Sequence, residues 1–293
     1  MKKGLFASLL RKRWELGFVE GGYDAVFSDE PLQVHWVRTP SKDYWYADPF
    51  ILDVTDDKVV ILAEEYRYKH PVGRIAKLII DRKSWTIERV DIILELDTHL
   101  SFPNIIQYNG EIYVFPENCR SGSLSIYKYD AKQEKLVYER VICDEALWDS
   151  DITDRFGGWR LFGGKTNEND LDAYVWDDAV RKFVYERSYH SQNGDFQLAG
   201  KFFEYKGEVY CPTQDCSMTY GGAVVIKKVV QRGDELDFVP VKRLESPNQM
   251  MNQGMHTLNE YKGVVVIDVK GFNNPFVGKL YTAFLKTKKK ECR

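Results

Sequence analysis

The sequence lacks the features of membrane-spanning and nucleic-acid-binding proteins. No apolar run among the 293 residues approaches the roughly 18 residues that a transmembrane helix needs. The net charge is only −3, so the chain has no general attraction to nucleic acid or to an anionic membrane. Any basic effect must therefore be local, and we expect no nucleic-acid partner.

Cysteine is also scarce, with five residues at irregular spacing. No CxxC motif is present, and no histidine stands at metal-ligand spacing from a cysteine. The pattern indicates neither a disulfide framework nor a zinc site, and it fits a reducing compartment. We therefore expect a cytoplasmic protein.

A repeated hairpin is the main feature that the sequence does have. The clearest copy, residues 102–117, places two apolar runs on either side of Asn109-Gly110. This pair is typical of tight turns in which both central residues have positive φ. Related turns are centred at 56–57, 157–158, 206–207 and 262–263.

The step from one turn to the next is about 50 residues, which lies in the range of propeller repeats. Segments for two outer strands follow the hairpin in the first two repeats. The pattern predicts an all-β fold, a single five-bladed β-propeller with four antiparallel strands per blade. A β-sandwich would give no reason for this grouping.

The predicted organisation is a basic amphipathic segment at 1–13, the propeller at 14–287 and a basic tail at 288–293. Residues 14–19 are predicted to form a strand that completes the last blade. The blades are expected to start near residues 47, 103, 151, 198 and 256.

The N-terminal segment has two interpretations. A short basic helix over residues 3–12 would either pack on the propeller or rest on an anionic cytoplasmic leaflet. The basic run 286–290 would reinforce a membrane attachment by charge. Because Arg11-Lys12-Arg13 directly follow its short apolar stretch, the segment does not fit a cleaved signal peptide.

Polar residues at the strand ends indicate where a site would lie. The two strands of each hairpin are antiparallel neighbours, so the start of the first lies beside the end of the second. The innermost strands of a propeller line its central channel, so these ends should gather around one pocket. By distance from each turn, the expected pocket residues are Asp48, Glu65, Asn104, Glu117, Asp151, Lys165, Gln214, Asp215, His256 and Lys270.

These residue types favour carbohydrate chemistry. Two carboxylates across a cleft serve glycosyl transfer, one as base or nucleophile and the other as acid. Lys165, Lys270, Arg120 and Arg74 are candidates for holding a phosphate or carboxylate of the substrate. The 14% of aromatic residues suits both strands and sugar-binding surfaces.

The stretch Tyr46-Ala-Asp-Pro-Phe50 resembles the opening of the first blade in family 43 glycoside hydrolases, the arabinanases and xylosidases of the levansucrase/invertase-like superfamily. The resemblance implies that Asp48 is the general base and that Asp151, or its neighbour Asp149, orients the sugar. It also implies a Glu acid near the start of the fourth blade, where residues 196–201 contain none.

Longer stretches resemble a branch made of single-domain bacterial proteins and the N-terminal domain of plant glucosamine inositolphosphorylceramide transferases. The most distinctive of them are residues 212–217 and 220–223, and the resemblance extends over about residues 14–285. Bacterial members of this branch resemble parts of surface-glycan biosynthesis.

Three functions follow as alternatives. The first is transfer of a sugar from a phosphate-linked donor to a glycan or lipid-linked acceptor in bacterial surface-glycan biosynthesis. Asp48 would then be the base, Asp151 and Glu117 would position the sugar, and Lys165, Arg120 or His256 would hold the leaving phosphate. The second is an inverting glycosidase that acts on a furanoside or similar glycan, with Glu117 or Asp215 as acid, and the third is a non-catalytic glycan-binding module. We expect no metal or other cofactor, with a calcium ion near His256 in the channel as an open alternative.

Overall fold

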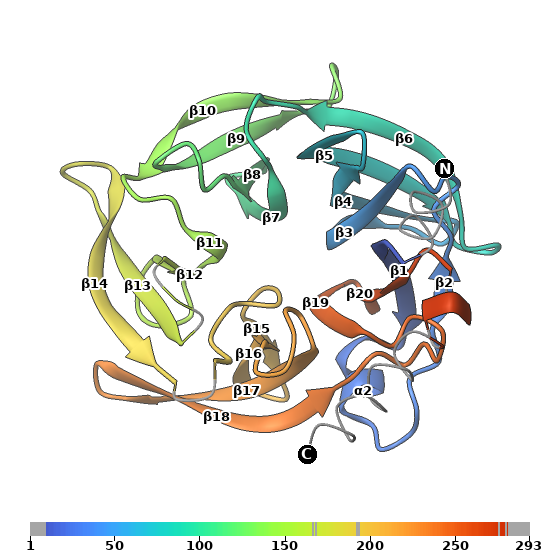
Figure 1. The fold of residues 1–293 in the computed structure, drawn as a ribbon. Coiled ribbons are helices and arrows are strands. Elements are labelled where there is room, and N and C mark those ends of the chain that lie inside the picture. Colours follow the sequence, from blue (N-terminus) through green and yellow to red (C-terminus); the bar gives the residue numbers. More distant parts are fainter. Residues whose placement is uncertain are drawn as a thin grey trace, which may run out of the picture.

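The computed structural model describes residues 10–165, 167, 169–191, 194–274, 276–278 and 280. Five four-stranded sheets stand around a common centre, and the first strand of each lies nearest to that centre (Figure 1). The predicted five-bladed propeller is therefore confirmed. In the described part of the chain, no helix has the length and apolar character needed to cross a membrane.

The first three blades follow the order of the chain. The first contains β3 (Tyr44–Val54), β4 (Lys58–Arg67), β5 (His70–Asp81) and β6 (Thr86–Leu94). The second contains β7 (Ser101–Tyr108), β8 (Glu111–Glu117), β9 (Leu124–Asp130) and β10 (Lys135–Cys143). The third contains β11 (Trp148–Thr153), β12 (Arg160–Gly164), β13 (Asp170–Asp177) and β14 (Lys182–His190).

The last two blades are less regular. The fourth contains a short inner strand, β15 (Phe203–Tyr205), followed by β16 (Glu208–Asp215), β17 (Ala223–Arg232) and β18 (Glu235–Leu244). The fifth combines β19 (Gly254–Tyr261) and β20 (Val264–Phe272) with β1 (Lys12–Glu20) and β2 (His35–Val37). The helix α2 (Gly22–Phe27) joins β1 to β2, and its Tyr23 stacks on Phe203 of the fourth blade.

Three of the hairpin turns have the predicted backbone. The φ angles of the two central residues are 51° and 78° at Asn109-Gly110, 51° and 79° at Lys206-Gly207, and 50° and 80° at Lys262-Gly263. Positive φ at both positions matches the right-handed twist of the flanking strands. In these three hairpins the turn therefore sets the strand pairing next to the loop.

The hydrophobic core lies between neighbouring blades. Phe50 of β3 meets Phe102 of β7 edge to face with ring centroids 4.8 Å apart, and Phe162 of β12 lies 4.7 Å from Phe202. Strands buried on both faces explain the nearly continuous apolar runs of the inner hairpins, such as that of β20. Each blade depends on its neighbours for burial, as expected of a repeat architecture.

The ring is closed by the N-terminal strand. β1 lies between β20 and β2 and pairs with β20 over nine positions, from Lys12↔Phe272 to Glu20↔Val264. The strand predicted over residues 14–19 thus has its expected place, and β2 is a further N-terminal strand of the same blade. The first and last strands of the described chain are thus paired in the fifth blade.

Several expectations fall outside the described residues. Positions 1–9 and 281–293 are not described, so the helix predicted over 3–12 and the tail 288–293 are not described either, although Lys12 already belongs to β1. Of the cysteines in the described residues, Cys119, Cys143, Cys211 and Cys216 are free thiols.

Closure predicts a sensitive position in β1. A Cβ atom at Gly17 would lie 2.6 Å from Val34 Cγ1 and 2.8 Å from Trp36 Cζ3. Gly17→Val should therefore overpack the joint and destabilise the protein by about 1–3 kcal/mol, measured by thermal unfolding. Val239→Ala, at an exposed position of β18, is the control and should change stability by less than about 0.5 kcal/mol. Equal unfolding temperatures of the two variants would contradict the tight packing of Gly17 against β2 and the segment before it.

Candidate active site

The first strand of four blades carries one extra residue at the same place. The register passes from Ala47↔Glu64 to Phe50↔Leu62 in the first blade and from Ser101↔Glu117 to Asn104↔Phe115 in the second. The same shift lies between Trp148 and Asp151 and between Met255 and Leu258. These β-bulges bend the strand and redirect its side chains at one end of the propeller.

Strained backbone marks three of these bulges. Asp48, Phe102 and Asp149 have φ angles of 50°, 43° and 40°, in the left-handed region that residues with a Cβ seldom adopt. Such residues cost about 1–3 kcal/mol each and are often found at functional sites. In this chain the strain turns Asp48 and Asp149 toward a common cavity.

The cavity has a volume of about 210 Å³ and is built by all five blades. Its lining combines carboxylates, imidazoles and aromatic rings, and it includes no lysine or arginine among the described residues. The lining residues are Trp14, Trp45, Asp48, Glu64, Tyr66, His99, Ser101, Glu117, Asp149, Gln197, Tyr220 and His256.

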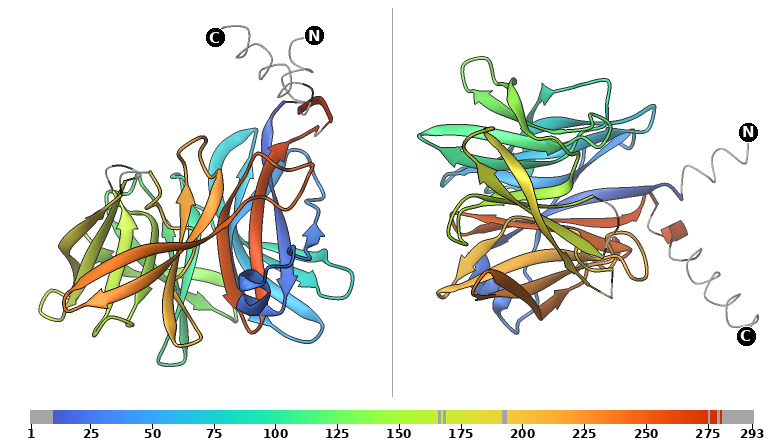
Figure 2. Two further views of the ribbon diagram at one scale, coloured as in Figure 1. Left: turned by 90° about the horizontal axis from the view of Figure 1, so that it is seen from below. Right: turned by 90° about the vertical axis from the view of Figure 1, so that its left-hand side faces the viewer.

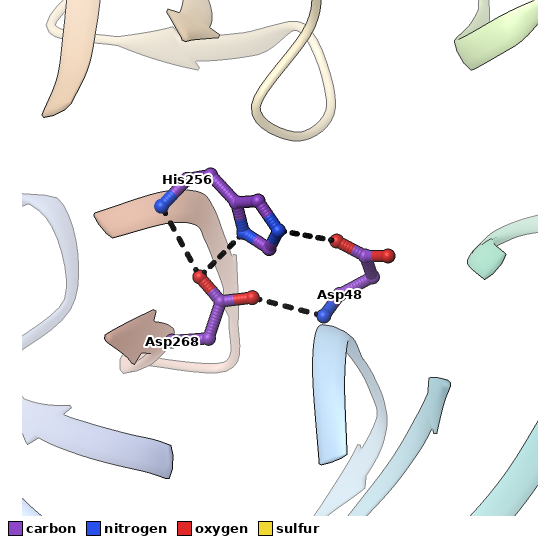
Figure 3. Close-up of side chains that lie close together, drawn as sticks. All are labelled: Asp48, His256 and Asp268. Carbon is purple, nitrogen blue, oxygen red and sulfur yellow. Dashed lines mark hydrogen bonds and ion pairs between the residues drawn. The ribbon is translucent and has the colours of Figure 1, made fainter. Parts of the chain in front are cut away.

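Asp48, His256 and Asp268 form a chain of interactions at the cavity floor (Figure 3). Asp268 Oδ1 lies 2.8 Å from His256 Nδ1, and His256 Nε2 lies 3.6 Å from Asp48 Oδ1. Trp14 of β1 stacks on the imidazole with ring centroids 3.6 Å apart. The imidazole is thus held in one orientation, with Nε2 toward Asp48.

The charges of this chain support one another. Burial opposes ionisation of His256, but the nearby carboxylates of Asp268 and Asp48 outweigh it and raise the pKa of the imidazole. Burial raises the pKa of Asp48 to about 6, against the opposing effect of His256. A carboxylate with this pKa accepts a proton near neutral pH, as a general base must.

The same three residues are candidates for a metal site, because their ligand atoms lie within 4.8 Å of one another. Asp268 is already saturated, however. Its Oδ1 accepts from His256 Nδ1 and from the backbone N–H groups of His256 and Thr257, and its Oδ2 accepts from the backbone N–H of Asp48. Calcium takes about 6–8 oxygen ligands, so this trio does not fit the ion, and we derive no step through a metal.

Asp149 and Glu117 form a second carboxyl pair in the cavity. The backbone N–H of Asp149 donates to Glu117 Oε2 at 3.1 Å, and the amides of Gln197 and Gln214 both donate to Asp149 Oδ2, at 2.6 and 2.8 Å. Burial and the charge of Glu117 raise the pKa of Asp149 well above its usual range. Asp149 therefore retains a proton at a pH where an isolated aspartate would lose it.

Glu64 is the third buried acid beside Asp48. Its Oε1 lies 3.2 Å from His99 Nε2, and the Nδ1 of the same imidazole accepts a hydrogen bond from the backbone N–H of Gly73. Burial raises the pKa of Glu64 well above its usual range, and the charges of Asp48 and Glu117 add to the effect. The cavity therefore holds acidic groups whose ionisation burial and mutual repulsion oppose, and a cation bound there would favour their charged forms.

The structure brings together some of the residues predicted from the sequence. Asp48, Glu117 and His256 line the cavity. Gln214 lies behind it on Asp149, and Asn104 binds Asp151 at 2.8 Å in a buried layer that also contains the backbone N–H of Phe202. Lys270 contacts the rim, where its Nζ donates to the carbonyl of Tyr220 and lies 5.1 Å from the Trp14 ring centroid.

Other predicted residues lie elsewhere. Glu65 pairs with Arg74 at 2.7 Å, Lys165 pairs with Glu145 at 2.7 Å, and Asp215 pairs with Arg243. Arg120 is exposed and does not line the cavity. In the first blade the bulge explains the difference, because one extra residue shifts the partner across the hairpin and so changes which side chains point inward.

Because of the bulges, counting outward from the turns also missed residues that line the cavity. Glu64 takes the place expected for Glu65, and Asp149, named only as an alternative, takes that of Asp151. Asp268 belongs to the interior of β20 and carried no separate signal. The remaining residues not predicted are Trp14, Trp45, Tyr66, His99, Ser101, Gln197 and Tyr220.

Two adjacent glutamates offer a test of the cavity's charge. Glu64→Gln should stabilise the protein by about 1–3 kcal/mol at about pH 8, because the raised pKa makes ionised Glu64 costly in the folded state. Protonated Glu64 does not carry this cost, and the native protein is destabilised as pH rises through the folded-state pKa of Glu64. The difference in unfolding free energy between Glu64→Gln and the native protein should therefore shrink toward about pH 5. Denaturant unfolding at several pH values measures it.

Glu65→Gln is the matched variant with the opposite expectation. It leaves Arg74 without the carboxylate that accepts from both Nε and Nη2, so it should destabilise the protein by about 1–3 kcal/mol. If both substitutions shifted stability in the same direction, the assignment of the two glutamates to different environments would fail.

Comparison with known sequences gives a consistent result. A family model described as glucosamine inositolphosphorylceramide transferase 1, N-terminal, matches residues 34–266. The chain is 30% identical over 255 residues to glucosamine inositolphosphorylceramide transferase 1 of Arabidopsis thaliana, covering 74% of this chain and 32% of that protein. It is 28% identical over 213 residues to the protein of the same name from Oryza sativa subsp. indica, covering 67% and 28%. The chain thus spans about a third of the length of these relatives.

Solved structures share the fold. The family 43 β-xylosidase/α-arabinofuranosidase CoXyl43 from a compost microbial metagenome superposes with a TM-score of 0.55 at 14% identity, covering 75% of this chain and 83% of that chain. An α-L-arabinofuranosidase from Clostridium thermocellum gives 0.51 at 15% identity, covering 74% and 79%. Both resemblances expected from the sequence motifs are confirmed, and at these identities the second concerns the fold alone.

Proposed function

The chain belongs to the family of the N-terminal domain of glucosamine inositolphosphorylceramide transferase 1, and from this premise we propose that its cavity catalyses transfer of a sugar to an acceptor hydroxyl. The observation that carries the proposal is the meeting of Asp48 with the Asp149–Glu117 pair in one aromatic-lined cavity. Two separately tuned carboxyl groups at one site are what substitution at an anomeric carbon requires.

Asp48 is the general base of this proposal. Its carboxylate accepts from the Thr257 hydroxyl at 3.2 Å and faces His256, whose cationic form stabilises the ionised state of Asp48. The proton of the acceptor hydroxyl passes to Asp48 while the oxygen attacks the anomeric carbon. Asp268 acts only through His256 and the Asp48 backbone, so it is a positioning residue.

The charge of the cavity favours an amino sugar. Asp48, Glu64, Glu117 and Asp149 line it without a lysine or arginine among the described residues. The ammonium group of a glucosamine unit would supply the missing positive charge, and the names of the relatives refer to glucosamine. Trp14, Trp45, Tyr66 and Tyr220 supply aromatic faces for the sugar ring.

The leaving group decides between two reactions. For a phosphate-linked donor, His256 in the cavity and Lys270 at its rim are the cationic groups available, since Lys165 and Arg120 lie elsewhere. The acceptor would then be a glycan or a lipid-linked sugar in surface-glycan biosynthesis. A glycosidase is the second candidate, because the proton retained by Asp149 can protonate a departing sugar oxygen.

A panel of donors separates these reactions. Nucleotide-linked glucosamine, N-acetylglucosamine and glucose would be offered with a sugar acceptor, in parallel with nitrophenyl glycosides of the same sugars in water. Transfer from the nucleotide-linked sugars supports the first reaction, and release of nitrophenol supports the second. If calorimetry detected sugar binding without turnover of any donor, the enzymatic proposal would be overturned in favour of a binding module.

Asp48→Asn tests the base. The substitution should lower turnover by at least about a hundredfold, because the amide cannot accept the proton of the attacking hydroxyl. The native enzyme should lose activity as pH falls below about 6, where Asp48 becomes protonated. Asp53→Asn, at a half-exposed position of the same strand that does not line the cavity, is the control and should retain turnover. Full turnover of Asp48→Asn would exclude Asp48 as base.

A further inference from the structure

Both ends of the described chain lie next to the cavity. The backbone N–H of Asn273 donates to the carbonyl of Arg11 at 2.8 Å, just beyond the last strand pair Lys12↔Phe272. Trp14, only three residues from Arg11, lines the cavity. Figure 2 shows the start of β1 and the end of β20 at the same end of the molecule. We call this end, where the cavity opens, the cavity face.

Basic sequence continues from both strands at this face. Residues 1–13 contain no acidic residue and five cationic ones, Lys2, Lys3, Arg11, Lys12 and Arg13. Residues 281–293 contain a single acidic residue, Glu291, and five cationic ones, Lys286, Lys288, Lys289, Lys290 and Arg293. A chain of nearly balanced charge therefore carries two strongly basic segments, one that includes Arg11 and one that begins eight residues beyond Asn273, the hydrogen-bond partner of Arg11.

Large apolar side chains are exposed at the same face. Met218, in the loop between β16 and β17, is 93% exposed, and Phe276 and Leu280, beyond β20, are 75% and 71% exposed. Phe276 and Leu280 are four residues apart, so in a helical turn they share one side. Tyr220, in the loop of Met218, both lines the cavity and is half exposed.

These side chains are presented by anchored segments. Asp215 Oδ1 accepts from the backbone N–H of Ser217, and the N–H of Gly222 returns to the carbonyl of Asp215, which fixes the loop of Met218. Asn274 accepts from the N–H of Val277, and a Cβ at Gly278 would overlap the Phe272 ring, so the turn of Phe276 packs closely on β20. Local hydrogen bonds and close packing thus hold the segments that carry the exposed Met218 and Phe276.

We propose that the cavity face docks on an anionic lipid surface, with Met218, Phe276 and Leu280 inserted among the headgroups and the two basic segments held by charge. Exposed apolar side chains surrounded by cations are the combination that stabilises proteins at membrane interfaces. Docking in this orientation would direct the cavity opening toward headgroups and lipid-linked sugars. This inference concerns binding and does not require the proposed reaction.

Charge argues against a second copy of the chain as the occupant. A two-fold dimer through the cavity face would bring the basic segments of both copies together, and like charges repel. An anionic bilayer instead attracts each cationic residue near its surface by about 1 kcal/mol, an attraction that salt weakens.

Vesicle sedimentation of the full chain tests the proposal. The protein should pellet with phosphatidylcholine vesicles that contain phosphatidylserine, remain in solution with phosphatidylcholine alone, and be released by high salt. The double variant Met218→Ser/Phe276→Ser should weaken the partition coefficient at least about tenfold, because two apolar anchors are lost. Val184→Ser/Val239→Ser, at exposed positions of outer strands β14 and β18, should leave it unchanged.

Unaltered thermal unfolding and turnover of a soluble donor would verify that the double variant is folded and that its cavity is intact. No binding of the native chain to the anionic vesicles would overturn the proposal. Equal binding of the two double variants, or a dimer that Met218→Ser/Phe276→Ser dissolves, would overturn it as well. Failure of the proposed reaction would instead leave sedimentation unchanged.

Discussion

The carboxylate of Asp268 holds the first and last blades in the arrangement on which the cavity depends. It accepts hydrogen bonds from the backbone of Asp48 in β3 and from the backbone of His256 and Thr257 in β19, and it orients the His256 imidazole. Asp268 is fully buried, so it has no solvent to replace a lost donor. Removing it would leave three buried N–H groups unpaired, each at a cost of about 1–3 kcal/mol.

The cavity stores unfavourable energy that the rest of the fold must offset. Four carboxyl groups stand in one space, three of them on buried residues, and two of these, Asp48 and Asp149, also have strained backbone. Part of this cost is offset by the amides of Gln197 and Gln214, which donate to Asp149, and by the imidazole of His256, which faces Asp48. Active sites commonly trade stability for function in this way, and a substrate cation would relieve the remaining repulsion.

The repeat made much of the architecture predictable. Turn residues such as Asn109-Gly110 require positive φ, and their regular spacing indicates blades, so five hairpins and the strand that closes the ring could be placed from the sequence. Asp48 was also predictable, from its position at the start of β3 and from the Ala-Asp-Pro-Phe resemblance.

The inward-facing residues of the other strand ends were less predictable. Counting outward from a turn assumes an unbroken ladder, whereas one extra residue in a bulge exchanges the two faces of the strand. Glu64 thus replaces Glu65 and Asp149 replaces Asp151, although no residue near either pair signals a bulge in advance. Gln197 stands before the short strand β15, where the resemblance implies a glutamic acid, so the fourth blade supplies an amide donor to Asp149 and not the acid itself.

Closure of the ring and completion of the cavity are the same event. Trp14 reaches His256 only when β1 is paired with β20, and the same pairing aligns Trp14 with Lys270 at the rim. Without β1, the imidazole would lose its stacking partner and the rim would lose one aromatic wall. Both ends of the chain must therefore meet before the cavity exists, so a chain that lacks β1 is expected to have neither a closed propeller nor a site. The exposed basic residues Arg11 and Lys12 lie at this same meeting point, so any surface that they bind would be coupled to the geometry of the cavity.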